Sequence, residues 1–249
     1  MCAGDEGEVW FSYNRIEDVV ADLLRDRRLD GHIDWDYTPL YGLDSEGIKS
    51  RLHGPFSAST YFEEACRLCN LDSGQGISTK AICLAGFTDT TNVLANLNAY
   101  PLFISLLNVR EDHRKTAKAV RLAGLIPIIE GCSANRKSQI LHQCIARVFS
   151  GFNDLHSEAK MRLCPDRRFR STRLFLAFWA ADLLEHWNLR CIMMIQGNCI
   201  SCKCPKDKLG EIIPVDDDGQ WPLPRYDSKE EKQRHQVAGD STRNMNIIP

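Results

Sequence analysis

Three apolar segments follow one another in the middle of the chain, and they constrain the fold more than any other feature. They comprise residues 81–87, 100–109 and 119–129, and a polar turn, Thr88-Asp89-Thr90-Thr91-Asn92, follows the first. Each has the length and the polar boundaries of a strand. Three successive strands with short links are typical of an antiparallel meander. The sequence therefore predicts a three-stranded antiparallel sheet here.

A fourth apolar run, residues 174–181, ends at Asp182. It is apolar on both faces, as a central strand is. It also contains good helix formers, so periodicity alone leaves strand and helix open. Residues 138–152, between the third and fourth runs, have helical periodicity, and the chain is therefore expected to be of the mixed α/β class.

The composition is that of an ordinary globular protein, and the net charge excludes a surface that is basic overall. The 249 residues are 43% hydrophobic and 26% charged, with a formal net charge of −2, so any DNA contact needs a local basic patch. Residues 1–8 carry no apolar leader, and no apolar run is long enough to cross a bilayer. Eleven cysteines are then thiols of a reducing compartment. We expect an intracellular chain with no membrane contact.

The remaining segments predict a divided organisation. Residues 9–29 and 58–68 have helical patterns, and residues 30–55 are expected to form an irregular connection. From residue 207 onward the chain is polar and contains several turn-forming residues. The expected parts are an N-terminal helical and irregular region, a core, a cysteine knuckle and a disordered tail, at residues 1–79, 80–190, 191–210 and 211–249.

Two aspartates stand directly after predicted strands. Asp89 follows the first strand and Asp182 closes the fourth run. A two-metal phosphoryl-transfer site needs carboxylates that converge from different strands, and oxygen ligands suit Mg²⁺ or Mn²⁺. The alternative is that Asp89 is a turn residue and Asp182 a surface or capping acid.

Two cysteine pairs have the spacing that can chelate a metal. Cys199 and Cys202 lie on a predicted turn, where two thiolates can bind one tetrahedral Zn²⁺ if two further ligands exist. A redox pair or simple turn cysteines are the alternatives. Cys66 and Cys69 fall inside a predicted helix and are expected to be buried cysteines.

An arginine cluster precedes the fourth run and is the candidate DNA contact. It includes Arg167, Arg168, Arg170 and Arg173, with Phe169 among them. Guanidinium groups bind phosphate bidentately. The alternative is that these arginines lie at the solvent-exposed start of a strand and form ion pairs with nearby acids.

Taken in order, these segments resemble the Plavaka family of transposases, fungal cut-and-paste elements of the CACTA-like group. The similar stretches, from about residue 9 to about residue 209, are Asp36-Tyr37-Thr38-Pro39, Phe87-Thr88-Asp89-Thr90-Thr91 (family S-D-K-T), residues 99–109, Cys164-Pro165-Asp166, Ala181-Asp182-Leu183-Leu184-Glu185 (family A-D-Y-P-E) and residues 195–202 (family QGWCPKC).

The resemblance implies a ribonuclease-H-like core of three antiparallel strands, a helix and a fourth strand. It implies that Asp89 and Asp182 are the first two catalytic aspartates, and that the run at 174–181 is a strand. Cys199 and Cys202 would belong to a zinc-binding insertion. The implied chemistry is Mg²⁺-dependent hydrolysis at DNA ends followed by strand transfer, with DNA as the partner and the nucleus as the compartment.

The chain also departs from the family pattern. Thr90 replaces the lysine of S-D-K-T, and Leu183-Leu184 replaces Tyr-Pro in D-Y-P-E. The family places its third acid far downstream, and Glu185 and Glu211 are no obvious substitutes. We therefore expect a truncated or degenerate DDE-type transposase, with weak or no catalysis alone, which assembles with an intact transposase. A non-catalytic DNA-binding or protein-interaction module derived from a transposase is the alternative.

Overall fold

The computed structural model describes residues 2–4, 7–43, 45–47, 49–51, 56–71, 78–88, 91–94, 97–129 and 131–181. Within these residues, no helix is both long enough and apolar enough to cross a membrane. The elements are β1 Cys2–Gly4, β2 Gly7–Val9, β3 Ser12–Tyr13, α1 Ile16–Arg25, η1 Arg27–Leu29, β4 Tyr41–Leu43, β5 Lys49–Arg51, η2 Phe56–Ala58, α2 Thr60–Leu71, β6 Lys80–Thr88, β7 Thr91–Leu94, β8 Leu97–Leu106, α3 Glu111–Arg114, β9 Val120–Pro127, α4 Ala134–Val148, α5 Phe152–Ser157, β10 Lys160–Leu163 and β11 Phe169–Ala180.

The chain divides into two compact units. One comprises Met1–Trp10, Ile128–Ala146 and Ala181–Pro249, and its described elements are the antiparallel β1–β2 hairpin and most of α4. The other comprises Phe11–Pro127 and Arg147–Ala180 and contains the large sheet. The four-part division expected from the sequence stays a prediction.

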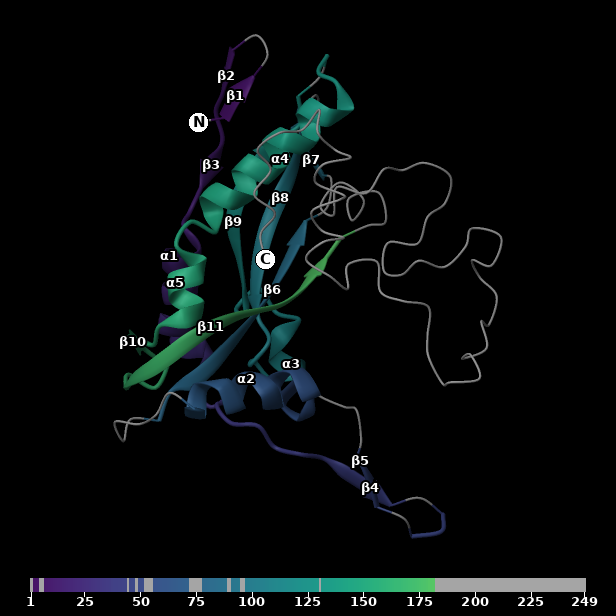
Figure 1. Ribbon diagram of the computed structural model, residues 1–249, viewed down its shortest axis with the longest axis vertical. Helices are drawn as coiled ribbons and strands as arrows, with labels where there is room; N and C mark the ends of the chain where they lie inside the picture. The colour runs from purple at the N-terminus through teal and green to yellow at the C-terminus, as the bar shows by residue number, and fades with distance from the viewer. Residues whose placement is uncertain are drawn as a thin grey trace. The chain divides into compact units, whose positions relative to one another are not determined.

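The large sheet is mixed and has the strand order β10-β11-β6-β8-β9-β3, with β7 also paired to β8 (Figure 1). Strands β6, β8 and β9 are antiparallel neighbours, which confirms the predicted meander and the α/β class. The ambiguous run lies in strand β11, which pairs parallel to β6 on the side opposite β8. Strands β3, β7 and β10 are not among the predicted elements, and β3 lies within residues 9–29, where a helix was expected.

The central strand β6 is buried on both faces from Ala81 to Ala85. Helix α2 covers one face, and the Ser59 Oγ accepts a hydrogen bond from the Phe62 N–H at the start of that helix. The shared core contains Phe62, Ala65, Cys69, Ala81, Cys83, Ala85, Leu107 and Phe175. The alternation of small residues on β6 with large ones on α2 and β11 allows this close packing.

Helix α1 presents the predicted apolar face, because Ile16, Val19, Val20, Leu23 and Leu24 are all buried. The helix is shorter than residues 9–29 because the chain on either side has other backbone partners. Strand β3 pairs with β9 before it, and Asp26 adopts an extended conformation after it, where its side chain accepts the Arg28 N–H and caps η1.

Buried Asn108 extends the hydrogen bonding of β6 where β8 no longer reaches it. The β6–β8 pairing stops at Leu84 and Leu106. Beyond it, the Asn108 Oδ1 accepts from the Cys83 N–H at 2.7 Å, and Nδ2 donates to the carbonyl oxygens of Ala81 and Asp34 at 2.9 and 3.0 Å. One side chain thus satisfies buried groups of β6 and holds the Asp34 loop against it.

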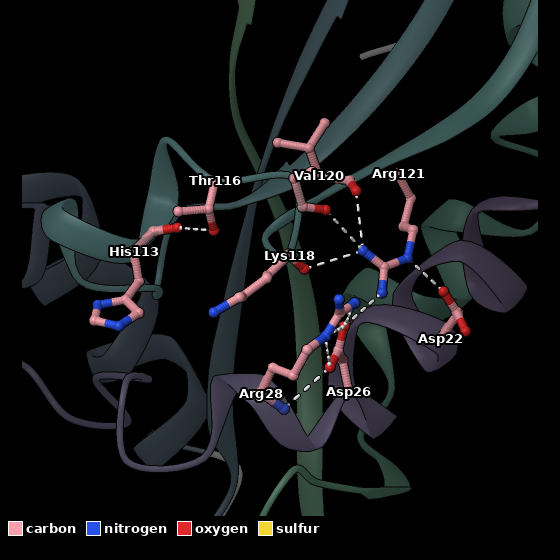
Figure 2. A network of polar contacts seen from close by, with 9 residues as sticks. Asp22, Asp26, Arg28, His113, Thr116, Lys118, Val120 and Arg121 are labelled. Carbon is pink, nitrogen blue, oxygen red and sulfur yellow. Dashed lines mark hydrogen bonds and ion pairs between the residues drawn. The ribbon is translucent and has the colours of Figure 1, made fainter.

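Arg121, at the start of β9, ties α1 to the sheet (Figure 2). Its Nε donates to Asp22, its Nη2 donates to Asp26 at 2.9 Å, and its Nη1 donates to the carbonyl oxygens of Ala117, Lys118 and Val120. Asp26 also accepts from the Arg28 side chain, at 2.6 Å from Nη2. These hydrogen bonds from Arg28, and secondarily from Arg121, hold the pKa of Asp26 well below its ordinary 3.8, against the effect of burial.

We expect Asp26→Asn to lower the free energy of unfolding by about 1 to 2 kcal/mol at neutral pH, because the Asp26 side chain is only 8% exposed and its charge-assisted hydrogen bonds are lost. A depressed pKa contributes stability above the unfolded value of 3.8, and that contribution disappears as the pH falls through the folded value. Urea unfolding of both proteins should therefore differ most at neutral pH and converge below pH 3.8.

Asp22→Asn is the matched control, because Asp22 binds the same arginine but its side chain is 66% exposed. It should cost less than about 1 kcal/mol. Equal losses for the two variants, or a difference that persists in acid, would contradict the assigned role of Asp26.

Candidate functional site

The carboxyl ends of β6 and β11 lie side by side at one end of the sheet. The two strands are parallel, and their last paired residues are Phe87 and Ala180. Thr88 ends β6 and is buried, and Ala181 follows β11. The carboxyl ends of parallel strands are common sites of bound ligands in α/β sheets. We call residues 86–88 and 179–180 the strand-end region.

A β-bulge in β11 sets the orientation of this region. Leu176 pairs with Leu84 and Phe178 with Ala85, so Ala177 is the extra residue. Tyr61, on α2, donates from its hydroxyl to the Leu176 carbonyl oxygen at 3.0 Å. Burial raises the pKa of Tyr61 to about 12, so the phenol stays protonated and donates at neutral pH.

The bulge changes which face each later side chain occupies, because alternation restarts after the extra residue. Trp179 consequently pairs with Gly86, and its Nε1 donates to the Thr88 Oγ1 at 3.3 Å. The indole lies directly over Gly86, where an added Cβ would fall 2.6 Å from Trp179 Cε3. Glycine is required at this position by the close approach of the ring.

Other aromatic rings surround the strand-end region and limit its movement. Phe149 contacts Trp179 with ring centroids 5.9 Å apart. On the neighbouring strand pair, Phe87 and Phe103 stack at 5.0 Å. Packed rings of this kind contribute beyond their buried area, so each strand end is held by its packing against a neighbouring segment.

The predicted metal ligands lie outside the described residues. These are Asp89, which follows Thr88, Asp182, which follows Ala181, and the pair Cys199 and Cys202. Within the described part of the chain, no group of three or more His, Cys, Asp or Glu side chains could hold a metal ion. Of the other predicted cysteine pair, Cys69 is buried, as expected, and Cys66 is half-buried.

The structure separates the four predicted DNA-binding arginines into two pairs. Arg173 is buried; its Nε donates to the His156 carbonyl oxygen at 2.8 Å and its Nη1 to that of Leu68 at 3.2 Å. Arg170 forms a bidentate ion pair with Asp166, with both distances 2.7 Å. Only Arg167 and Arg168 are exposed. Arg170 and Arg173 therefore stabilise the fold, whereas Arg167 and Arg168 are exposed and can face a ligand.

No clear sequence pattern predicts the β10–β11 hairpin, whose turn contains these exposed arginines. Strand β10 has only four residues, Lys-Met-Arg-Leu, two of them charged, so it lacks a β-branched or aromatic pattern. It pairs antiparallel with the start of β11 from Leu163 and Phe169 to Lys160 and Thr172. The turn residues Pro165 and Asp166 between two alternating segments were the signal that could have indicated a hairpin.

Comparisons with known proteins identify one family. A family model described as Plavaka transposase matches residues 3–241, which is nearly the whole chain. No curated protein and no solved structure matches this chain.

We expect Gly86→Ala to lower the free energy of unfolding by about 1 to 3 kcal/mol, because the new methyl group displaces the Trp179 indole and breaks its hydrogen bond to Thr88. Urea unfolding measures the loss, and near-ultraviolet circular dichroism reports the displaced ring.

Trp179→Leu and the double variant complete the test. If the clash causes the loss, Gly86→Ala should cost clearly less when Trp179 is already leucine. Strictly additive losses would show that Gly86 has some other role.

Proposed function

Because this chain belongs to the Plavaka transposase family, we propose that it derives from a DDE-type DNA transposase and retains part of its catalytic core. The ancestral reaction is metal-dependent cleavage of DNA strands at element ends, followed by strand transfer. DNA is then its partner and the nucleus its compartment, and assembly with an intact transposase follows from the same proposal.

The strand topology supports a ribonuclease-H-like core. Strands β6, β8 and β9 form the antiparallel part, helices follow, and β11 returns to pair parallel to β6. This is the order of elements that the family resemblance predicts. A parallel return next to the first strand also requires a long connection, which β8, β9, α4 and α5 supply.

The register of β11 on β6 is the observation that carries the proposal. Phe87 and Ala180 are paired, Asp89 is two residues after Phe87, and Asp182 is two residues after Ala180. The two candidate aspartates therefore follow adjacent parallel strands at equal distances along the chain. This symmetry is what two carboxylates need in order to share a metal site at one end of a sheet.

The donor chemistry fits a hard divalent cation. Asp89 and Asp182 supply carboxylate oxygens, which Mg²⁺ and Mn²⁺ prefer. These residues would hold the cation, which would supply an activated water and neutralise charge at phosphorus. The chain's own contribution is to position the two acids, since the bulge, Trp179 and Thr88 hold the strand ends that precede them.

We expect purified protein to nick supercoiled DNA weakly with Mn²⁺ or Mg²⁺, and not with a chelator present. The rate should be low because only two of the family's three acids are identified in this sequence. Asp89→Asn and Asp182→Asn should each abolish nicking and weaken Mn²⁺ binding, as measured by electron paramagnetic resonance, because each removes a ligand oxygen charge.

Asp18→Asn is the control, because Asp18 is an exposed acid of α1; it should leave nicking and Mn²⁺ binding intact. Nicking that survives both substitutions contradicts the catalytic assignment. DNA binding with neither nicking nor Mn²⁺ binding supports the alternative, a non-catalytic DNA-binding module, which the exposed Arg167 and Arg168 favour.

We also propose that Cys199 and Cys202 bind a structural Zn²⁺, because two thiolates on a short turn match half of a tetrahedral site. Purified protein should contain about one zinc per chain by mass spectrometry. Cys199→Ser and Cys202→Ser should lose it, whereas Cys132→Ser, which changes a half-buried free thiol, should retain it. Absence of zinc from the parent protein removes this site.

A further inference from the structure

Strands β10 and β11 form a hairpin that extends beyond the pairing of β11 with β6. Phe169, Arg170 and Ser171 pair with β10, whereas the pairing with β6 begins only at Thr172. Figure 1 shows β11 running from this hairpin across the sheet to the strand-end region. Residues 164–169 form the hairpin tip, which is closed by Cys164 N–H to the Arg168 carbonyl oxygen and Arg167 N–H to that of Cys164, both 2.9 Å.

The hairpin tip presents two exposed arginine side chains and an exposed aromatic ring. Arg167 and Arg168 are exposed, and the Phe169 side chain is 66% exposed. The one acid of the tip, Asp166, binds Arg170 with both oxygens and lies only within 3.9 Å of Arg168 Nε. The Arg170 side chain, the Arg168 N–H and both charges hold the pKa of Asp166 at about 2, so this internal pair persists at neutral pH.

Contacts of Asp166 and of the adjacent Arg170 make the hairpin tip rigid. The Arg170 guanidinium stacks over Trp35, 4.3 Å from its centroid, and the Asp166 carboxylate accepts the Arg168 N–H at 3.2 Å. A preorganised turn orders less on binding and so presents its exposed groups at lower entropic cost.

Arg167 has a backbone conformation that favours glycine. Its φ is +65°, and it is the one non-glycine with positive φ in the described part of the chain. A branched or long side chain there is strained relative to glycine. An arginine at such a position, with an exposed side chain, points to a role for its charge.

The length of β11 sets a distance between the hairpin tip and the strand-end region. The strand has 12 residues, so at a rise of about 3.3 Å per residue its first and last Cα atoms are at most about 36 Å apart. One turn of B-form DNA is also about 34 to 36 Å, or roughly 10 base pairs. A two-stranded β-ribbon fits the major groove of such a duplex.

We propose that the hairpin tip binds duplex DNA about one helical turn from the phosphate at the strand-end region. Arg167 and Arg168 contact backbone phosphates, and Phe169 makes an apolar contact in the groove. The proposal rests on the proposed function for the position of the cut, but the DNA contact itself does not require catalysis. It separates an anchoring contact at one end of β11 from the chemistry at the other.

Arg167→Gly is the decisive variant because it should stabilise the protein while weakening DNA binding. Relief of the positive φ should raise the midpoint of thermal unfolding by about 2 °C. Loss of one phosphate contact should weaken binding to a duplex of about 30 base pairs by about fivefold, and should reduce the slope of log K against log salt by about one. Loss of binding through misfolding cannot produce this combination.

Three further variants complete the set. Arg168→Ala should reduce the salt slope in the same way, whereas Phe169→Ala should weaken binding and leave the slope unchanged, since it carries no charge. Arg27→Ala, which removes an exposed arginine from η1, should change neither. Hydroxyl-radical footprints of the nicked complex should lose protection about 10 base pairs from the nick in the tip variants.

Unchanged affinity in both arginine variants overturns the proposal even if metal-dependent nicking is present, so the two failures are distinguishable. Equal weakening by Arg27→Ala overturns it as well, because the effect is then one of net charge. Protection lost next to the nick overturns the spacing. Binding of the tip to anionic vesicles in preference to DNA assigns it to a membrane surface instead.

Discussion

The parallel pairing of β11 with β6 is the constraint on which the rest of the structure depends. Eight residue pairs join the two strands, from Thr172 and Lys80 to Ala180 and Phe87. A parallel neighbour cannot be reached by a tight turn, so the chain between them must supply a long connection. The strands and helices between residues 91 and 163 form that connection, and two of the strands widen the sheet on the other side of β6.

Polar side chains hold this arrangement where backbone pairing is incomplete. Asn108 satisfies β6 beyond the end of β8, and Tyr61 satisfies the carbonyl group at the β11 bulge. His156 Nδ1 lies 2.9 Å from the Leu174 carbonyl oxygen, where β10 no longer reaches β11. Each replaces a missing ladder bond, so the two central strands remain bonded over most of their length. Buried polar groups without such partners would be destabilising.

Much of the sheet was predictable from sequence because β6, β8 and β9 are strongly apolar and closely spaced. Whether β11 is a strand or a helix could not be predicted, because a strand buried on both faces shows no alternation of apolar and polar residues. The bulge at Ala177 also has no local signal, because it depends on Tyr61 from a distant helix. The burial of Arg173 could not be predicted either, because its hydrogen-bond acceptors are backbone carbonyl oxygens of Leu68 and His156, which only the folded chain brings close. The roles of Asp89, Asp182, Cys199 and Cys202 stay predictions.

The net charge of −2 is compatible with the proposed DNA contact, because some arginines are neutralised within the fold while others stay exposed. Arg121 is paired with Asp22 and Asp26, and Arg170 with Asp166, so these arginines add little to the external field. Arg167 and Arg168 remain exposed at the end of the β10–β11 hairpin. Because exposed charges farther apart than about 8 to 10 Å are screened from one another at physiological salt, local charge governs contact with a phosphate backbone. A chain that is acidic overall can therefore present a basic contact at one end of its longest strand.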